Sequence, residues 1–154
     1  MSVYILQRTQ QLPISIGQAW DFFSRPDNLQ DITPAYMNFR ILSNSNSKEM
    51  YAGQVITYKV SPLFGIPLFW MTEITHVKDR EYFVDEQRFG PYALWHHTHR
   101  FKEIPGGVEM LDMVHYKMPF GWLGQLLAGW FVKRQVEGIF DYRYKVLQDR
   151  FGKM

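Results

Sequence analysis

A chain of 154 residues is long enough to bury one core and too short for two domains, so we expect a single domain spanning residues 1–154. The net charge is +2 and the basic residues are scattered, which excludes a nucleic-acid-binding tract, and the absence of cysteine excludes disulfides, thiol catalysis and zinc-thiolate sites. Aromatic residues make up 17% of the chain. This is more than a compact core of this size requires, so they either line a cavity or fill the inside of a curved sheet.

The chain opens with a segment typical of a strand. Residues 3–12 are rich in β-forming side chains and end at Pro13. Ser15 and Gln18 match the capping box that begins a helix, and Pro26 favours the start of a second short helix. One strand followed by two short helices is therefore predicted for the first part of the chain.

After these helices the pattern is almost entirely strand. Six further strands, joined by short turns into an antiparallel meander, are predicted at residues 38–42, 54–60, 68–77, 82–89, 93–103 and 108–117. Residues 61–70 are unusually apolar for a connecting loop. We interpret this segment as a flap over the core.

The last stretch predicts one long helix, because no proline follows Gly121. Its apolar residues change sides halfway, from Leu123, Leu126, Leu127 and Trp130 to Val132, Val136, Ile139, Phe140 and Leu147. Either the helix breaks near Gly129, or its first turns present an apolar face to a ligand, a partner subunit or a membrane. Arg143 lies within the second stripe, and we expect it to reach water from the stripe's edge rather than form a buried ion pair.

Two sequence blocks carry a family resemblance. The first runs from Leu12 to Leu29 and continues through Ile32-Thr33-Pro34, and the second runs from Asp85 to Phe101. With the order of elements, they resemble the START-like and Bet v 1-like (SRPBCC) superfamily, and the second block is similar to a bacterial subgroup of ligand-binding domain proteins. The resemblance implies an α+β helix-grip fold, in which a curved antiparallel seven-stranded sheet wraps around the C-terminal helix and leaves a cavity. It implies no particular reaction, because one fold hosts many functions.

The hairpin within the second block holds the most distinctive polar side chains. Strand alternation places Trp95, His97, His99 and Phe101 on one face, which we expect to point inward. A two-residue turn at Gly106-Gly107 would give the pairs Phe101 with Asp112, His99 with Val114 and His97 with Tyr116. The Asp112 carboxylate would then lie near the His99 imidazole.

Three interpretations of these polar groups remain open. Metal is not expected, because alternate positions supply only His97 and His99, and a third ligand such as Asp112 would have to converge by chance of register. A histidine and aspartate pair acting as acid and base is a second interpretation. We favour a third, in which these groups hydrogen-bond to one another or orient a ligand. No cofactor is expected, because no phosphate loop or nucleotide fingerprint is present.

The leading functional hypothesis is a non-enzymatic carrier or sensor of an apolar or aromatic small molecule, lipid-like, quinone-like or polyketide-like. The candidate ligand-contacting residues are Trp20, Phe23, Phe83, Asp85, Arg88, Trp95, His97, His99, Phe101, Asp112, Tyr116, Val136, Ile139, Phe140 and Arg143. The first alternative is a cyclase-like or hydrolase-like enzyme that uses His97 or His99 with Asp112. The second is an interaction module that acts through exposed apolar surface.

Location and partners follow from what the ends and the apolar segments contain. No signal-peptide pattern or membrane-spanning run is present, so we expect a cytoplasmic protein. In the helix-grip architecture that the chain resembles, residues 63–70 and 123–130 are expected to meet as a gate to the cavity. Its side chains Phe64, Ile66, Phe69, Trp122 and Trp130 suit either transient membrane contact or a homodimer interface.

Overall fold

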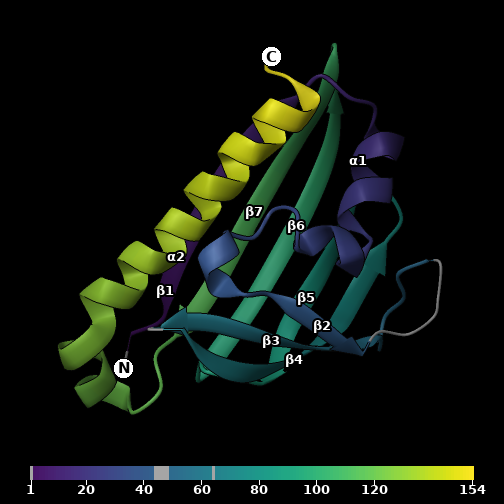
Figure 1. The fold of residues 1–154 in the computed structure, drawn as a ribbon. Coiled ribbons are helices and arrows are strands. Elements are labelled where there is room, and N and C mark those ends of the chain that lie inside the picture. Colours follow the sequence, from purple (N-terminus) through teal and green to yellow (C-terminus); the bar gives the residue numbers. More distant parts are fainter. Residues whose placement is uncertain (1, 44–48, 64) are drawn as a thin grey trace.

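The computed structural model describes residues 2–43, 49–63 and 65–154. In chain order the elements are β1 Tyr4–Leu12, α1 Ile16–Phe23, η1 Pro26–Leu29, η2 Ala35–Met37, β2 Arg40–Ser43, β3 Val55–Leu63, β4 Ile66–Lys78, β5 Tyr82–Phe89, β6 Leu94–Ile104, β7 Gly107–Lys117 and α2 Gly121–Phe151. The seven strands form one antiparallel sheet in the order β1-β7-β6-β5-β4-β3-β2. The sheet curves around α2 (Figure 1), which confirms the expected α+β helix-grip fold.

The short helices lie on the same side of the sheet as α2 (Figure 1). The capping box is present, since the Gln18 backbone N–H donates to Ser15 Oγ at 3.2 Å and the Ser15 N–H donates to Gln18 Oε1 at 3.0 Å. The helix α1 buries Trp20, whose ring meets Phe83 and Phe101 edge-on. The 3₁₀ helix η2 was not predicted, because three residues are too short to show a helical period.

The apolar segment 61–70 is not a loop, and that prediction is wrong. The strand β3 continues to Leu63 and β4 begins at Ile66, and these two residues pair across a tight hairpin. Pro62 lies where the register of the two strands shifts, so its missing N–H interrupts no regular ladder. Phe64, one of the expected gate residues, lies outside the described residues.

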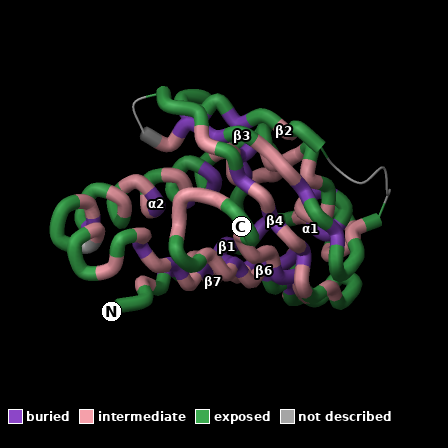
Figure 2. Tube along the Cα trace, turned by 90° about the horizontal axis from the view of Figure 1, so that it is seen from below, coloured by how far each residue is buried: buried purple, intermediate pink, exposed green. Residues whose placement is uncertain are grey.

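The C-terminal helix α2 is continuous over 31 residues, so it does not break near Gly129. Its second apolar stripe is buried, with Val136 1% and Phe140 4% exposed. Its first stripe faces away from the protein, with Leu126 73% and Leu127 76% exposed. Figure 2 shows the exposed end of the helix near the N-terminus, and the second of the two sequence-based alternatives is confirmed.

Within the described chain, the polar contacts between α2 and other elements begin at Gln135, whose Nε2 donates to the Pro62 carbonyl of β3. Asp141 accepts from Arg8 of β1 at 3.1 Å, and Gln10 of β1 donates to the Tyr144 carbonyl at 2.9 Å. Near the C-terminus, Arg150 pairs with Asp31 at 2.9 Å. These contacts leave the first turns of α2 without a comparable covering layer (Figure 1).

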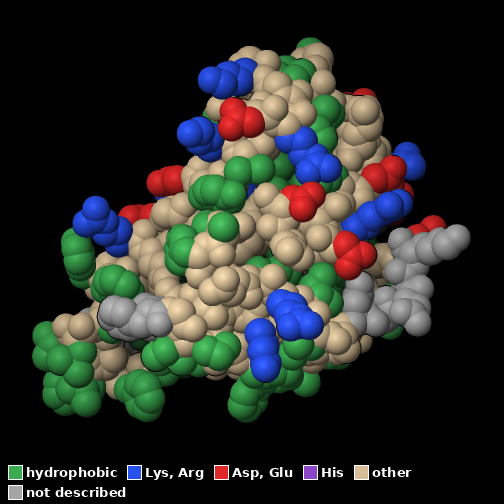
Figure 3. Space-filling model, in the orientation of Figure 1, with side chains coloured by type: hydrophobic (Ala, Val, Ile, Leu, Met, Phe, Trp, Pro, Cys, Tyr) green, Lys and Arg blue, Asp and Glu red, His purple; other side chains and the backbone are tan. Residues whose placement is uncertain are grey.

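An apolar surface patch results at the start of α2, and we call Phe120, Trp122, Leu123, Leu126, Leu127, Trp130 and Phe131 the helix patch. Every member is at least 45% exposed, and Figure 3 shows hydrophobic side chains gathered at this corner of the molecule. Ile66 and Phe69 of β4 are also exposed, at 56% and 38%. Within the described part of the chain, no helix is long and apolar enough to cross a membrane.

Candidate functional site

The hairpin of β6 and β7 sets the register of the site. Ile104 pairs with Gly107, so the turn is Pro105-Gly106, with Gly106 in the left-handed region at φ 84°. The expected turn at Gly106-Gly107 is therefore wrong by one residue. A Cβ at Gly107 would lie 2.1 Å from the Leu12 carbonyl oxygen, so this glycine is needed inside the strand, where β1 passes closely.

The corrected register moves each predicted pair by two residues. Asp112 lies opposite His99 rather than Phe101, and His97 lies opposite Val114. A shift of two keeps every side chain on its face, because side chains alternate with period two. The predicted inward orientation is confirmed, since the side chains of His97 and His99 are both buried.

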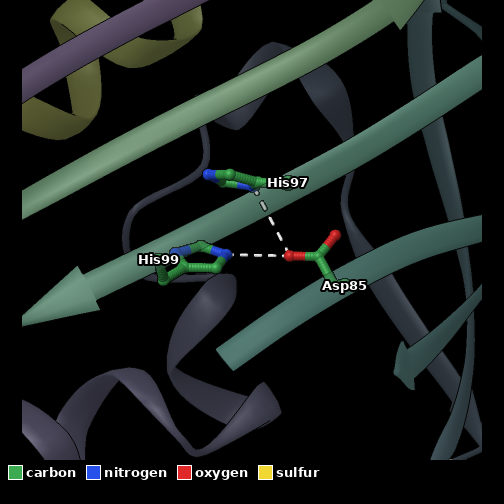
Figure 4. A group of neighbouring side chains, drawn as sticks. All are labelled: Asp85, His97 and His99. Carbon is green, nitrogen blue, oxygen red and sulfur yellow. Dashed lines mark hydrogen bonds and ion pairs between the residues drawn. The ribbon is translucent and has the colours of Figure 1, made fainter. Parts of the chain in front are cut away.

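The two imidazoles share a carboxylate from the neighbouring strand (Figure 4). Asp85 of β5 pairs directly with His97 of β6, and the three side chains converge. Asp85 Oδ2 lies 2.8 Å from His99 Nε2 and 3.4 Å from His97 Nδ1. The two rings are packed together with centroids 3.7 Å apart, and Phe83 stacks on the outer side of His99 at 4.1 Å.

A second carboxylate closes the other side of the pair. Asp112 Oδ1 lies 2.9 Å from His97 Nε2 and 2.9 Å from His99 Nδ1. All four ring nitrogens therefore face carboxylate oxygens, so the two imidazoles are held between Asp85 and Asp112. We call these four residues the His-Asp cluster.

Burial and hydrogen bonding act in opposite directions on the two carboxylates. Burial raises the pKa of Asp112, but hydrogen bonds from His97 and His99 outweigh it and hold that pKa well below its usual range. Burial likewise raises the pKa of Asp85, but the charge of His97 and the hydrogen bond and charge of His99 leave that pKa below its usual value. Both aspartates are therefore ionised at neutral pH.

The pKa values of the two histidines shift in opposite directions. Burial and the neighbouring His99 lower the pKa of His97. Burial also opposes charge on His99, but its hydrogen bonds to Asp112 and Asp85 raise its pKa above the usual value. We therefore assign His99 as an imidazolium that donates from both nitrogens and His97 as a neutral ring that donates from Nε2. The long 3.4 Å contact at His97 Nδ1 fits a nitrogen without a proton.

The same geometry bears on metal binding. Among the described residues, Asp85, His97 and His99 form a group whose ligand atoms all lie within 4.8 Å of one another. Two histidines and one carboxylate form a recognised donor set, and Asp112 would orient both rings from behind. The third ligand atom comes from Asp85, whereas Asp112 was the third ligand considered from the sequence. A bound cation would have to displace the His99 Nε2 proton, because that nitrogen already donates to Asp85.

The His-Asp cluster forms one wall of a cavity of about 160 Å³ between the sheet, α2 and the short helices. Asp85, His97 and His99 line it, and Asp112 lies behind them. Apolar and aromatic side chains make up most of the remaining lining. They include Leu29, Ile32, Met37, Phe39, Val60 and Trp70.

The structure places ten of the candidate ligand-contacting residues around this cavity. They are Phe23, Phe83, Asp85, Trp95, His97, His99, Val136, Ile139, Phe140 and Arg143. Trp20 and Phe101 pack instead in the core beneath α1, and Tyr116 packs in the core beside Tyr4. These three aromatic residues and Asp112 do not form part of the lining.

Arg88 was predicted to contact the ligand, and this prediction is wrong. Its guanidinium lies on the outer face of β5, where Nε donates to Glu73 at 2.6 Å and Nη2 lies 3.4 Å from Glu86. Asp85 and Arg88 are an odd number of positions apart, so strand alternation directs them to opposite faces. Arg88 therefore does not reach the cavity.

Several lining residues were missed in the sequence. Tyr58 and Trp70 stack at 5.8 Å, and both the Tyr58 hydroxyl and Trp70 Nε1 contact Thr72 Oγ1 at 3.0 Å. Alternation along β3 and β4 would have placed Tyr58 with Val60, and Trp70 with Thr72, on inward faces. The apolar run around Pro62 hid this signal, because it read as a loop.

Comparison with known proteins extends this picture. The polyketide cyclase/dehydrase and lipid transport family matches residues 12–141. No curated protein is significantly similar in sequence to this chain.

Similar solved structures share the fold at low sequence identity. Protein CV1439 from Chromobacterium violaceum has a TM-score of 0.73 at 10% identity, covering 98% of this chain and 99% of its own. A START superfamily protein from Mycobacterium smegmatis has a TM-score of 0.66 at 12% identity, covering 96% of each chain. Ara h 8.0201 has a TM-score of 0.63 at 12% identity, covering 96% of this chain and 99% of its own. These structures establish the START/Bet v 1-like (SRPBCC) helix-grip fold, and the match over residues 12–141 shows that the chain belongs to the polyketide cyclase/dehydrase and lipid transport family.

Proposed function

We propose that this protein binds and carries an apolar or aromatic small molecule, of lipid-like, quinone-like or polyketide-like character. The observation that carries the proposal is the cavity of about 160 Å³, whose lining is mostly apolar and includes a few convergent polar groups. Such a composition favours a ligand with a large apolar body and one polar end. The family's range, which spans cyclases and lipid transport, is compatible with this class of ligand.

The state of the two imidazoles favours binding over acid-base catalysis. A general base needs a nitrogen lone pair directed at the substrate. In the His-Asp cluster every ring nitrogen faces a carboxylate oxygen, and the unprotonated nitrogen, His97 Nδ1, faces Asp85. Both rings line the cavity, which suits orientation of a ligand.

Two measurements test the proposal. Native mass spectrometry of freshly purified protein is expected to show a co-purifying small molecule that departs on denaturation. A His99→Ala variant then separates the two classes, because an enzyme would keep substrate binding while losing turnover. A carrier has no turnover to lose, so conversion of the co-purifying molecule by the wild-type protein, abolished in His99→Ala, would instead establish the cyclase-like or hydrolase-like alternative.

We further propose that the helix patch contacts an anionic lipid surface from which the ligand enters. The chain carries no charged residue between Lys117 and Lys133, and Arg134 follows directly, so cations flank the patch on both sides. Arg134 lies 5.5 Å from the centroid of the Trp130 ring. Tryptophan and leucine next to basic residues are the composition of helices that lie in a membrane interface. Liposome flotation tests this contact, and a second copy of the chain is the competing occupant of the patch.

A further inference from the structure

Arg143 of α2 is a buried cation that forms no ion pair with the described residues. Its side chain lines the cavity and is only 8% exposed, which corrects the expectation that it reaches water. The guanidinium lies 4.8 Å from the centroid of the Phe140 ring. Its Nε is buried without a hydrogen-bond partner, and no carboxylate of the described chain forms an ion pair with it.

The carboxylates of the His-Asp cluster are already engaged by the two histidines. The charge of Arg143 contributes to holding the pKa of Asp85 low, so the two groups interact through space. However, Asp85 Oδ2 accepts from His99 and lies beside His97, and Asp112 lies behind the two rings. A buried Nε–H without an acceptor is costly, because the donor loses its water and gains no hydrogen bond in return.

We propose that Arg143 receives the carboxylate of the bound ligand, so that the ligand is an apolar acid. The inference rests on the proposed function, since it names the polar end of the molecule in the same cavity. A guanidinium offers parallel donors that match the two oxygens of a carboxylate, and the remaining apolar lining accommodates the body of the acid. A phosphate monoester carries about −1.5 to −2 charges at neutral pH, more than one unpaired cation can balance.

The test compares matched ligands by isothermal titration calorimetry at neutral pH. The probes are decanoic acid and naphthoic acid, with decanol and naphthyl methanol as neutral counterparts of the same shape. Arg143→Met keeps an apolar stem against Phe140 and removes the charge, whereas Arg143→Lys keeps the charge without the planar fork. Because a hydrogen bond to a charged group is worth about 1.5–3 kcal/mol, Arg143→Met is expected to weaken acid binding about tenfold to a hundredfold.

Each outcome decides a different point. Weaker acid binding in Arg143→Met, unchanged alcohol binding and partial recovery in Arg143→Lys support the proposal. Equal changes for acid and alcohol in both variants, or acid binding that Arg143→Met leaves intact, overturn it while the carrier function stands. If the wild-type protein binds none of the four probes and carries no ligand in native mass spectrometry, the carrier function itself fails.

Discussion

Two regions of this protein reverse the usual distribution of side chains. The His-Asp cluster and Arg143 put charged groups inside, where Asp112, His97 and His99 are buried. The helix patch puts large apolar groups outside, where Trp122 is 71% and Trp130 72% exposed. Apart from Arg143, the second half of α2 follows the ordinary distribution, with Val136 and Leu147 buried in the core.

The contrast teaches which parts of the sequence serve something other than folding. A buried ion network is often no more stabilising than apolar residues of the same volume, and an exposed apolar patch gives up burial that another arrangement would gain. Neither region is explained by the stability of the isolated chain. This contrast motivates the two proposals, a polar ligand group for the buried region and a partner surface for the exposed one.

The largest expected effect on stability comes from removing a carboxylate of the His-Asp cluster. Asp112→Ala removes the carboxylate that accepts from both imidazoles and leaves two buried ring nitrogens unpaired. We expect a loss of about 3–5 kcal/mol in the free energy of unfolding, measured by urea denaturation. The control is Asp141→Ala, which breaks the exposed ion pair with Arg8 and is expected to cost about 0–1 kcal/mol. Equal losses in the two variants would show that the cluster is solvated and not buried.

Filling the cavity is expected to have a smaller effect on stability and a large effect on binding. Ile139 lines the cavity from α2, so Ile139→Trp places a larger ring in the ligand's space. Overpacking is expected to cost about 1–3 kcal/mol while abolishing binding of apolar probes. Tyr142→Trp on the exposed side of the same helix is the control and should bind as the wild type does. Undiminished binding in Ile139→Trp would place the ligand elsewhere.

The pH dependence of stability reports the same inner region. The pKa values of Asp112 and Asp85 are lowered by folding, so their stabilising contribution is present above the unfolded value of about 3.9 and is lost as the pH falls through the folded values. The pKa of His99 is raised, so its contribution is full below about 6.5 and is lost as the pH rises through its folded pKa. Folding lowers the pKa of His97, so the unfolded chain protonates this ring more readily than the folded one. The free energy of unfolding therefore decreases as the pH falls from about 6.5 through the folded pKa of His97.

Denaturation midpoints measured from pH 2 to 9 check these signs. The wild type is expected to lose stability toward both ends of this range. A His99→Asn variant should be less stable at neutral pH and lack the decline on the alkaline side, whereas His76→Asn, at an exposed position of β4, should follow the wild type. An alkaline decline that survives in His99→Asn would assign it to another group.

Metal removal is expected to change nothing. Binding a cation between Asp85, His97 and His99 would require loss of the His99 Nε2 proton, which the two carboxylates stabilise. We therefore expect elemental analysis to find no stoichiometric transition metal, and chelator treatment to leave the melting temperature unchanged. A full equivalent of zinc or iron, absent from a His97→Ala, His99→Ala double variant, would contradict this.

Patterns within a single element were the part of the fold that the sequence predicted well. The capping box at Ser15, the two apolar stripes of α2 and the inward face of β6 all follow from short-range periodicity. Predictions that depended on where a strand turns were less secure. The β6–β7 turn was predicted one residue too late. Val114 was therefore predicted opposite His99, whereas Asp112 lies opposite His99 in the structure.

The site itself depended on contacts between distant strands. Asp85 joins the histidines through the β5–β6 register, which no local pattern specifies. Arg143 was expected at the surface because a long charged side chain usually reaches water. The packing of α2 on the sheet instead buries the Arg143 side chain. Prolines at 62 and 67 concealed the β3–β4 hairpin, because proline normally interrupts a strand.

Substitutions in the helix patch are expected to have almost no effect on folding and a large effect on association, the opposite of substitutions in the His-Asp cluster. In a Trp122→Ser, Trp130→Ser variant both substitutions lie on exposed positions, so the free energy of unfolding should change by less than about 0.5 kcal/mol. Binding to a lipid surface depends on buried apolar area and on attraction between cations and anionic lipid. The wild type is therefore expected to float with vesicles of phosphatidylglycerol and phosphatidylcholine, and less with phosphatidylcholine alone. Flotation should be lost in the tryptophan variant and weakened in Lys133→Gln, Arg134→Gln, while Tyr142→Ser, outside the patch, behaves as the wild type.

Light scattering on the same samples measures the mass in solution. A wild-type dimer that becomes a monomer in the tryptophan variant, with no flotation in either, would show that a second copy covers the patch, and an unchanged monomer that never floats would exclude both occupants.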